Sequence, residues 1–233
     1  MNRKQLNLLM RKNTMLNERK LEYIVNATNT IAKNNIEGDI VECGVWMGGS
    51  AALIADTLLQ HKQTRMIHLL DSFDDPHEPL PVDGPYLIKL LGGMKRAKGR
   101  LQTIKGFYDK VTKGKGPGDP RVVYNLLVKS VGYPKEKIKF HKGWFQNTVA
   151  SVSESIDKIS FLIIDCDLYA PTKLCLEYLC PKVVPNGLIF IDDYPTLDGC
   201  KKAVDDYVVK HKIRSKFIRV PGAGCIAWLV EGK

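Results

Sequence analysis

Two short apolar runs of this chain each end in closely spaced aspartates. They are residues 161–164, followed by Asp165 and Asp167, and residues 188–191, followed by Asp192 and Asp193. Uninterrupted apolar runs of this length are typical of strands that a parallel sheet buries on both faces. Neighbouring parallel strands bring their carboxyl ends to one edge, where open α/β sheets hold their ligands. The pattern predicts an α/β fold with four carboxylates gathered at a ligand-binding edge.

Four carboxylates at one edge repel one another, and each raises the pKa of the others unless a cation lies among them. Hard oxygen ligands of this kind suit Mg²⁺, Ca²⁺ or Mn²⁺ rather than zinc. The alternative is that some of these acids cap helices or lie in solvent. Acids directly after buried strands are more often functional than scattered ones, so we favour a cation site.

The rest of the chain alternates strand-like and helical segments. We expect strands at residues 39–42, 66–70 and 138–141, and helices at residues 21–33, 50–60, 122–131, 171–179 and 200–210. Ser50 is the expected N-cap of its helix, and Pro185-Asn186-Gly187 is expected to form a turn before the second acid-bearing strand. Two final strands, at residues 216–220 and 224–230, form an expected hairpin. This order predicts a mostly parallel sheet with one antiparallel excursion.

The chain divides into a helical arm at residues 1–37 and one domain at residues 38–233. Within that domain, residues 73–120 interrupt the alternation, because they are rich in Pro, Gly and Lys and show no clear strand. An insertion of this length in a compact domain is typical of a lid or binding loop, with a disordered linker as the alternative. We expect a lid over the substrate, open to proteolysis near residues 113–115.

A glycine-rich turn follows the first strand, in the run Glu42-Cys43-Gly44-Val45-Trp46-Met47-Gly48-Gly49-Ser50. Glycines let the backbone approach a ligand closely, and the helix that follows offers free N–H groups. The spacing is neither the G-x-G-x-x-G of a dinucleotide site nor a Walker loop. Asp71 ends the next strand, where an acid can accept hydrogen bonds from both ribose hydroxyls. Glu42 could orient an amino group, so the two acids together favour S-adenosylmethionine as the ligand.

Size and charge set further bounds. With 233 residues, 44% of them hydrophobic, the chain can form one sizeable core, and it lacks the roughly 20 consecutive apolar residues of a membrane span. The net charge of +10 indicates either a solvated basic face or an acidic partner such as a phosphorylated substrate or nucleic acid. Six scattered cysteines without zinc spacing, and no secretory signal, favour reduced thiols and a cytoplasmic location.

Taken together, these motifs resemble the macrocin O-methyltransferase (TylF/MycF-type) family of class I methyltransferases. The matching runs are residues 40–49, Asp71-Ser72-Phe73, residues 143–148, residues 165–169 and residues 185–194. They occur in the right order over most of residues 38–210. The resemblance implies a seven-stranded Rossmann-like sheet, S-adenosylmethionine as methyl donor, and Mg²⁺-dependent transfer to a hydroxyl of a sugar on a natural product. Mn²⁺ stays open as the metal.

The resemblance also implies roles for single residues. It makes Asp165, Asp192 and Asp193 the metal ligands and Asp167 the general base. The candidate cofactor-binding residues are Glu42, Gly44, Gly48, Ser50, Asp71, Ser72, Trp144 and Asp165. The chain departs from the family pattern at Ala170, where the family usually has Glu, and at Val149-Ala150 in place of Leu-Pro. The insertion at residues 80–119 shows no match to the family pattern.

Three rival functions remain open. A class I methyltransferase could act on a catechol or on RNA, although no RNA-specific motif accompanies the basic charge. A non-catalytic module could bind S-adenosylmethionine, but an idle acid cluster carries an electrostatic cost. The glycine spacing disfavours a nicotinamide-dependent dehydrogenase. We expect a glycosylated small molecule as acceptor, with no membrane partner, nucleic acid disfavoured, and a homo-oligomer left open.

Overall fold

A seven-stranded sheet forms the centre of the computed structural model, which describes residues 3–74, 79–91, 95–97, 100–102, 116–214 and 217–231. The strand order is β5-β2-β1-β6-β7-β9-β8. The strands are β1 (Asp39–Cys43), β2 (Ile67–Asp71), β5 (Ile138–Lys142), β6 (Ile159–Ile164), β7 (Val183–Asp192), β8 (Ile218–Arg219) and β9 (Cys225–Leu229). The first five are parallel to one another, and β9 pairs antiparallel with both β7 and β8. The predicted α/β fold with a C-terminal antiparallel hairpin is confirmed.

The strand order reverses between β1 and β6. From β1 the chain builds outward through β2 to β5, then returns to place β6 on the other side of β1. Such a reversal opens a crevice outside the carboxyl ends of the two strands, because their following connections run to opposite sides. The glycine loop follows β1, and Asp165 follows β6. The topology therefore brings the two predicted motifs to the same crevice.

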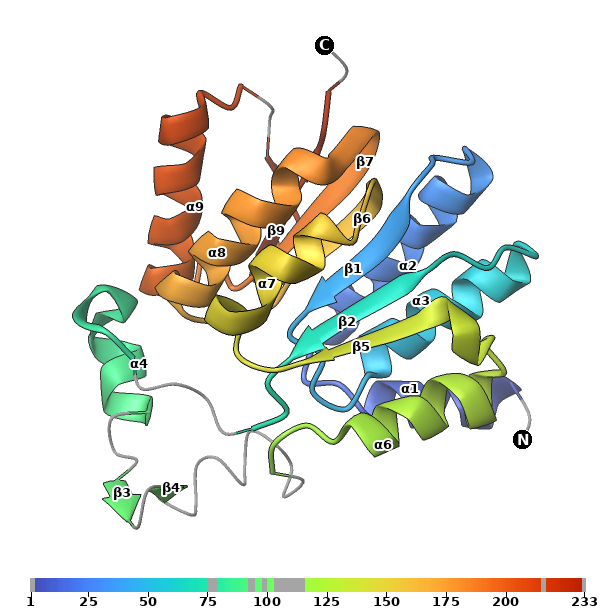
Figure 1. Cartoon of the computed structure of the whole chain (residues 1–233), viewed down its shortest axis with the longest axis horizontal. Helices are drawn as coiled ribbons and strands as arrows, with labels where there is room; N and C mark the ends of the chain where they lie inside the picture. Colours follow the sequence, from blue (N-terminus) through green and yellow to red (C-terminus); the bar gives the residue numbers. More distant parts are fainter. Residues whose placement is uncertain are drawn as a thin grey trace.

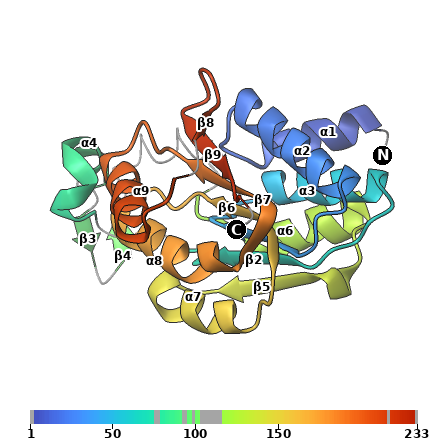
Figure 2. The same ribbon diagram turned by 90° about the horizontal axis from the view of Figure 1, so that it is seen from above.

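Helices cover both faces of the sheet (Figure 2). One face carries α7 (Phe145–Glu154), α8 (Tyr169–Leu179) and α9 (Asp198–His211). The other carries α1 (Arg3–Lys12), α2 (Glu18–Lys33), α3 (Gly49–Gln60), α6 (Pro120–Tyr124) and the π-helical turn Asn125–Val131 that continues α6. Every residue of the apolar run Phe161–Ile164 is fully buried, because side chains on both faces of β6 meet a helical layer.

The insertion lies beyond the carboxyl ends of the parallel strands, as Figure 1 shows for α4 and the small β3–β4 sheet. Its described part contains a 3-10 turn (Pro81–Asp83), α4 (Gly84–Leu91), β3 (Lys95–Ala97) and β4 (Arg100–Gln102), the last two paired antiparallel. The prediction that the segment has no clear strand was therefore wrong for these short elements. The cleavage region predicted at residues 113–115 lies outside the described residues.

Three local predictions were wrong for identifiable reasons. Ser50 does not cap α3, which begins at Gly49 after Gly48 in a left-handed conformation; the Ser50 hydroxyl turns inward instead. The expected turn at Pro185-Asn186-Gly187 lies inside β7, where Asn186 adopts a positive φ of 65°. The expected helix at residues 122–131 divides into α6 and the π-helical turn.

Among the described residues, no helix is long and apolar enough to cross a membrane.

The N-terminal arm consists of two helices, α1 and α2. α2 starts at Asn17, whose side chain accepts a hydrogen bond from the backbone N–H of Lys20. The Asn17 amide also donates to the carbonyl of Ala223 at 3.0 Å, and Arg19 donates to the carbonyl of Pro221 at 2.9 Å. These contacts fix the start of α2 against the turn between β8 and β9, close to the end of β7.

Candidate active site

Three of the four predicted aspartates form one cluster. Oxygen atoms of Asp165, Asp167 and Asp193 all lie within 4.8 Å of one another, and Asp167 and Asp193 share a hydrogen bond. The fourth, Asp192, is the last residue of β7 and only 5% exposed. Its carboxylate pairs instead with a lysine of α2, with 2.5 Å between Lys20 Nζ and Asp192 Oδ1.

The backbone explains how Asp165 and Asp167 meet. Residues two apart in an extended segment point to the same face of a sheet. Just after β6 the backbone also turns, since Asp167 has a φ of 59°. Asp193 has a φ of 56°. Aspartate tolerates this left-handed conformation better than most residues, and such strain is concentrated at functional sites.

Burial and mutual repulsion raise the pKa values of the cluster. Burial raises the pKa of Asp165 well above its ordinary value, and the charge of Asp192 adds to the effect. The Asp167 side chain is open to solvent on one side, yet the protein atoms around it, and then Asp193, raise its pKa to about 7. Burial, then Asp193, raises the pKa of Asp192 to about 6 even though Lys20 opposes this. The cluster is thus an electrostatically unfavourable arrangement that a cation would relieve.

Lys20 belongs to the site but was not among the predicted residues, because it was treated only as part of the helical arm at residues 1–37. Its Nζ also lies 3.3 Å from Asp193 Oδ1. The missed signal is helical spacing: Lys20 lies one turn before Ile24 and shares the buried face of α2 with it. A lysine on the apolar face of a helix needs an acidic partner, because an unpaired buried charge is strongly destabilising.

The glycine loop packs directly against the acid-bearing strand. Gly44 has a φ of 91°, and a Cβ there would overlap the carbonyl oxygen of Asp165. Glu42 is 1% exposed, and one carboxylate oxygen accepts a hydrogen bond from the Ser50 hydroxyl. The other oxygen, Oε2, has no partner among the described residues. Burial raises the pKa of Glu42 to about 8, although the Ser50 bond opposes the rise. A ligand that brings an amino group to Oε2 would satisfy it.

Asp71 organises the glycine loop from the end of β2. Its Oδ2 accepts hydrogen bonds from the backbone N–H groups of Val45 at 2.6 Å and Trp46 at 2.9 Å, and its Oδ1 accepts from Phe73 N–H at 2.7 Å. A carboxylate offers about four acceptor positions, so one remains for a ribose hydroxyl. The predicted ribose contact is thus compatible with the geometry, but holding the loop is a second role that the sequence did not indicate.

The two other predicted cofactor residues lie beside Asp71. Ser72 follows it directly, and its hydroxyl accepts a hydrogen bond from Asp74 N–H at 3.3 Å. Trp144 precedes α7, and the neighbouring Gly143 donates its N–H to the Asp71 carbonyl at 2.9 Å. The structure therefore brings together the loop after β1, the end of β2 and the loop after β5.

Both ends of the insertion are fixed to the site. Asp83, 2% exposed, accepts hydrogen bonds from Tyr169 N–H at the start of α8 and from Leu80 N–H, both at 2.6 Å. At the other end, Trp46 of the glycine loop donates its indole N–H to the Gly116 carbonyl at 3.0 Å. One anchor thus lies just after the acid cluster and the other on the glycine loop. This arrangement fits a lid across the crevice.

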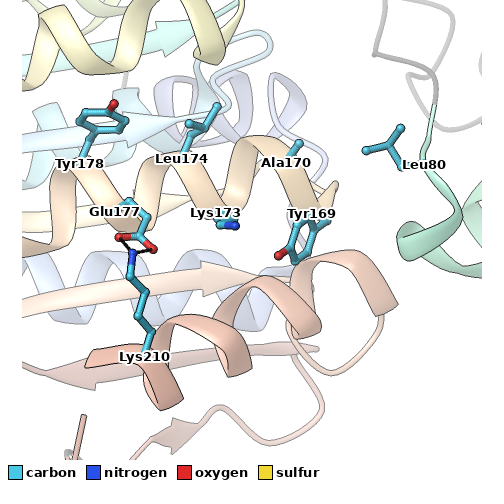
Figure 3. A pocket seen from close by; sticks show the side chains of 8 residues that line it. All are labelled: Leu80, Tyr169, Ala170, Lys173, Leu174, Glu177, Tyr178 and Lys210. Atoms are coloured by element: carbon cyan, nitrogen blue, oxygen red, sulfur yellow. Dashed lines mark hydrogen bonds and ion pairs between the residues drawn. The ribbon is translucent and has the colours of Figure 1, made fainter. Parts of the chain in front are cut away.

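A separate open groove of about 700 Å³ lies on the outer side of α8 and α9 (Figure 3). Its walls include Leu80, Tyr169 and the ion pair between Lys210 and Glu177. None of the four aspartates lines this groove. It is a surface feature beside the lid anchor rather than the site of chemistry.

These features define a class I O-methyltransferase, which uses S-adenosylmethionine. They are a seven-stranded sheet of this order, a glycine loop after β1, and acids at the ends of β1, β2, β6 and β7. Sequence comparison places the chain within that class: residues 10–89 and 123–229 match the family described as macrocin-O-methyltransferase (TylF). The chain belongs to this family, as its motifs predicted. The match resumes only after residue 122, so the unmatched part of the insertion is shorter than expected and begins after residue 89.

Known relatives agree with this assignment. A demethyldecarbamoylnovobiocin O-methyltransferase of Streptomyces niveus is 31% identical over 91% of this chain and 73% of its own length. A mycinamicin III 3''-O-methyltransferase of Micromonospora griseorubida is 23% identical over 91% of this chain and 76% of its own length. The solved structure of the O-methyltransferase NovP superposes with a TM-score of 0.74 at 28% identity, covering 94% of this chain and 83% of that chain.

The buried Glu42 predicts a pH-dependent stability. A carboxyl whose pKa is higher in the folded state than its ordinary value of 4.5 destabilises the fold progressively as pH rises from that value through the folded pKa of about 8. Glu42→Gln should therefore raise the free energy of unfolding of the cofactor-free protein, by on the order of 3 kcal/mol at pH 8 and little at pH 4. Urea unfolding at a series of pH values measures this.

Glu37→Gln is the matched control, because Glu37 is exposed just before the same strand and its replacement should leave the pH dependence unchanged. The stabilised Glu42→Gln protein should also bind S-adenosylmethionine more weakly. A Glu42→Gln variant whose stability advantage did not grow with pH would show that Glu42 is ionised in the folded protein.

Proposed function

We propose that this O-methyltransferase transfers a methyl group to a hydroxyl of a sugar or related small molecule, with Mg²⁺ held by Asp165, Asp192 and Asp193. The observation that carries the proposal is the acid cluster beside the glycine loop, where Gly44 packs against the Asp165 carbonyl. Donor and acceptor sites that share a wall in this way suit an in-line transfer, because positioning supplies much of the acceleration.

The residues present suit a divalent cation. The carboxylates of Asp165, Asp167 and Asp193 offer oxygen atoms within 4.8 Å of one another, which is the hard donor set that Mg²⁺ and Mn²⁺ prefer. Asp192, the third proposed ligand, precedes Asp193 directly and would turn from Lys20 toward the metal. Burial, and then the neighbouring aspartates, raise the pKa values of Asp165 and Asp192, and a cation would offset the repulsion among these carboxylates. A bound divalent cation would lower the pKa of an acceptor hydroxyl and orient it.

Asp167 is the proposed general base. It lies in the cluster, within reach of a hydroxyl held there, and its carboxylate is open to solvent on one side. Without metal, burial and then Asp193 raise the pKa of Asp167 to about 7; a divalent cation nearby would lower it, so that Asp167 would be ionised and able to accept a proton at neutral pH. Asp167 is the exposed member of the cluster, whereas Asp165 and Asp193 are partly buried.

The proposed cofactor site extends along the glycine loop. Glu42 Oε2 would accept a hydrogen bond from the amino group of the methionine end, and Asp71 would accept from the ribose. The lid, fixed through Asp83 and Gly116, would close over the acceptor and exclude water. The relatives are named as O-methyltransferases of demethyldecarbamoylnovobiocin and of mycinamicin III. These names favour a glycosylated natural product as acceptor.

A screen of glycosylated acceptors and their aglycones with labelled S-adenosylmethionine tests this function. Mass spectrometry should find the label on a sugar hydroxyl, and EDTA should abolish the transfer until Mg²⁺ is restored. Transfer that persists in EDTA would contradict the metal part of the proposal. Equal labelling of aglycones would contradict the acceptor class.

Asp71→Ala is expected to weaken S-adenosylmethionine binding by roughly 1.5–3 kcal/mol, the range for a hydrogen bond to a charged group. Because Asp71 also holds the glycine loop, lost affinity alone does not identify a ribose contact. The discriminating measurement compares S-adenosylhomocysteine with its 2′-deoxy and 3′-deoxy analogues by calorimetry. The wild type should prefer the ribose form over at least one analogue, and Asp71→Ala should lose that preference. A preference retained in the variant would place the ribose elsewhere.

The different roles proposed for the acids predict that two variants lose different properties. Asp165→Ala should lose Mg²⁺ affinity and activity together, whereas Asp167→Asn should keep Mg²⁺ and cofactor binding but lose turnover by roughly 10²–10⁴-fold, as expected for a missing general base. Mg²⁺ titration and single-turnover rates measure both. Asp157→Asn, exposed just before the start of β6, is the control and should change neither. If Asp167→Asn abolished Mg²⁺ binding and Asp192→Asn kept it, Asp167 would be the third ligand.

A further inference from the structure

Lys20 brings a positive charge from the N-terminal arm into the acid cluster. Its side chain is 10% exposed, and its Nζ lies 2.5 Å from Asp192 Oδ1 and 3.3 Å from Asp193 Oδ1. The contact joins residues more than 170 positions apart in the sequence. Among the described residues, two ion pairs involve these four carboxylates, and Lys20 is the cation in both.

The position of Lys20 is set by the helix and not by the ion pair alone. The start of α2 is fixed by Asn17 and Arg19, which donate hydrogen bonds to the carbonyls of Ala223 and Pro221. The next residues of the same helix face, Leu21 and Ile24, are buried in the core. The lysine side chain carries a compact charge on a flexible four-carbon stem, so its ammonium group can move while the helix stays in place.

The pairing involves two of the three acids that the family pattern assigns to the metal, Asp192 and Asp193. Asp192 faces Lys20 rather than the cluster formed by Asp165, Asp167 and Asp193. Burial opposes the charge of Lys20, but Asp192 and Asp193 outweigh it and raise the pKa of Lys20 above its ordinary value. An ammonium and a divalent cation repel each other, so both cannot be held closely by the same two carboxylates.

We propose that Lys20 is a built-in counter-cation that competes with the divalent cation for Asp192 and Asp193. This inference rests on the proposed function, because it concerns the same metal site. Without metal, Lys20 offsets the repulsion among the carboxylates and keeps the carboxyl edge folded. When metal binds, the ammonium withdraws from Asp192. Lys20 thereby sets how tightly the metal is held and makes the metal-free enzyme stable.

Lys20→Met tests the competition, because methionine keeps the length of the side chain and removes its charge. Isothermal titration with MgCl₂ should show Mg²⁺ binding at least about tenfold tighter than in the wild type, since a nearby positive charge is gone. The melting temperature without metal should fall, and Mg²⁺ should close most of the gap. Lys33→Met, exposed at the other end of the same helix, should match the wild type in both measurements.

A second measurement uses the unaltered protein. Acetic anhydride should modify Lys20 faster when Mg²⁺ is present than in its absence, as read by peptide mass spectrometry with Lys33 as the internal reference. An unchanged rate would contradict withdrawal of the ammonium. A Lys20→Met protein that stayed unfolded even with Mg²⁺ would also contradict the proposal, because the metal could then not replace the lost charge.

The outcomes separate this inference from the proposed function. If the wild type binds Mg²⁺ and Lys20→Met binds it equally or more weakly, competition is refuted and the metal site stands. If only Lys20→Met binds Mg²⁺, competition stands and the wild-type metal dependence is refuted. If neither protein binds Mg²⁺, both are refuted.

Discussion

Repulsion among four carboxylates at the ends of β6 and β7 is the constraint around which the site is organised. The parallel sheet fixes the two strand ends side by side, and the left-handed turn at Asp167 directs its carboxylate back toward Asp165. Like charges this close are tolerated only when protonated or when a cation is nearby. The chain supplies one such cation from α2, in Lys20, and offers oxygen ligands for another.

The cofactor side of the crevice depends on the same crowding. Gly44 has no side chain where the loop meets the Asp165 carbonyl, so the glycine loop and the acid cluster are in direct backbone contact. Asp71 holds this loop through two N–H groups. The two described ends of the insertion attach here as well, through Asp83 to the start of α8 and through Gly116 to the glycine loop.

The sequence predicted what depends on local pattern. Buried strands such as residues 161–164 are identifiable because both faces are apolar, and acids that follow them necessarily gather at one edge of a parallel sheet. The family and the sheet topology were predicted from these motifs and confirmed.

What escaped prediction depends on long-range contact or backbone detail. Lys20 gave only a weak spacing signal, because its partners lie at the far end of the chain. Ser50 fits the N-cap pattern, but the buried Glu42 captures its hydroxyl. The left-handed turn at Asp167 gave no sequence signal, since aspartate is compatible with either conformation. The hydrogen bonds by which Asp71 holds the glycine loop likewise follow from the path of that loop.

The claim at the centre of this account is that the acid cluster holds a divalent cation next to the cofactor loop. Anomalous diffraction from crystals soaked in MnCl₂ tests it most directly, because manganese is located independently of activity. The account predicts a single strong peak bonded to carboxylate oxygens of Asp165 and Asp193, at roughly 2.1–2.4 Å as for hard-cation sites. The absence of a peak at these carboxylates, with Lys20 still paired to Asp192, would contradict it.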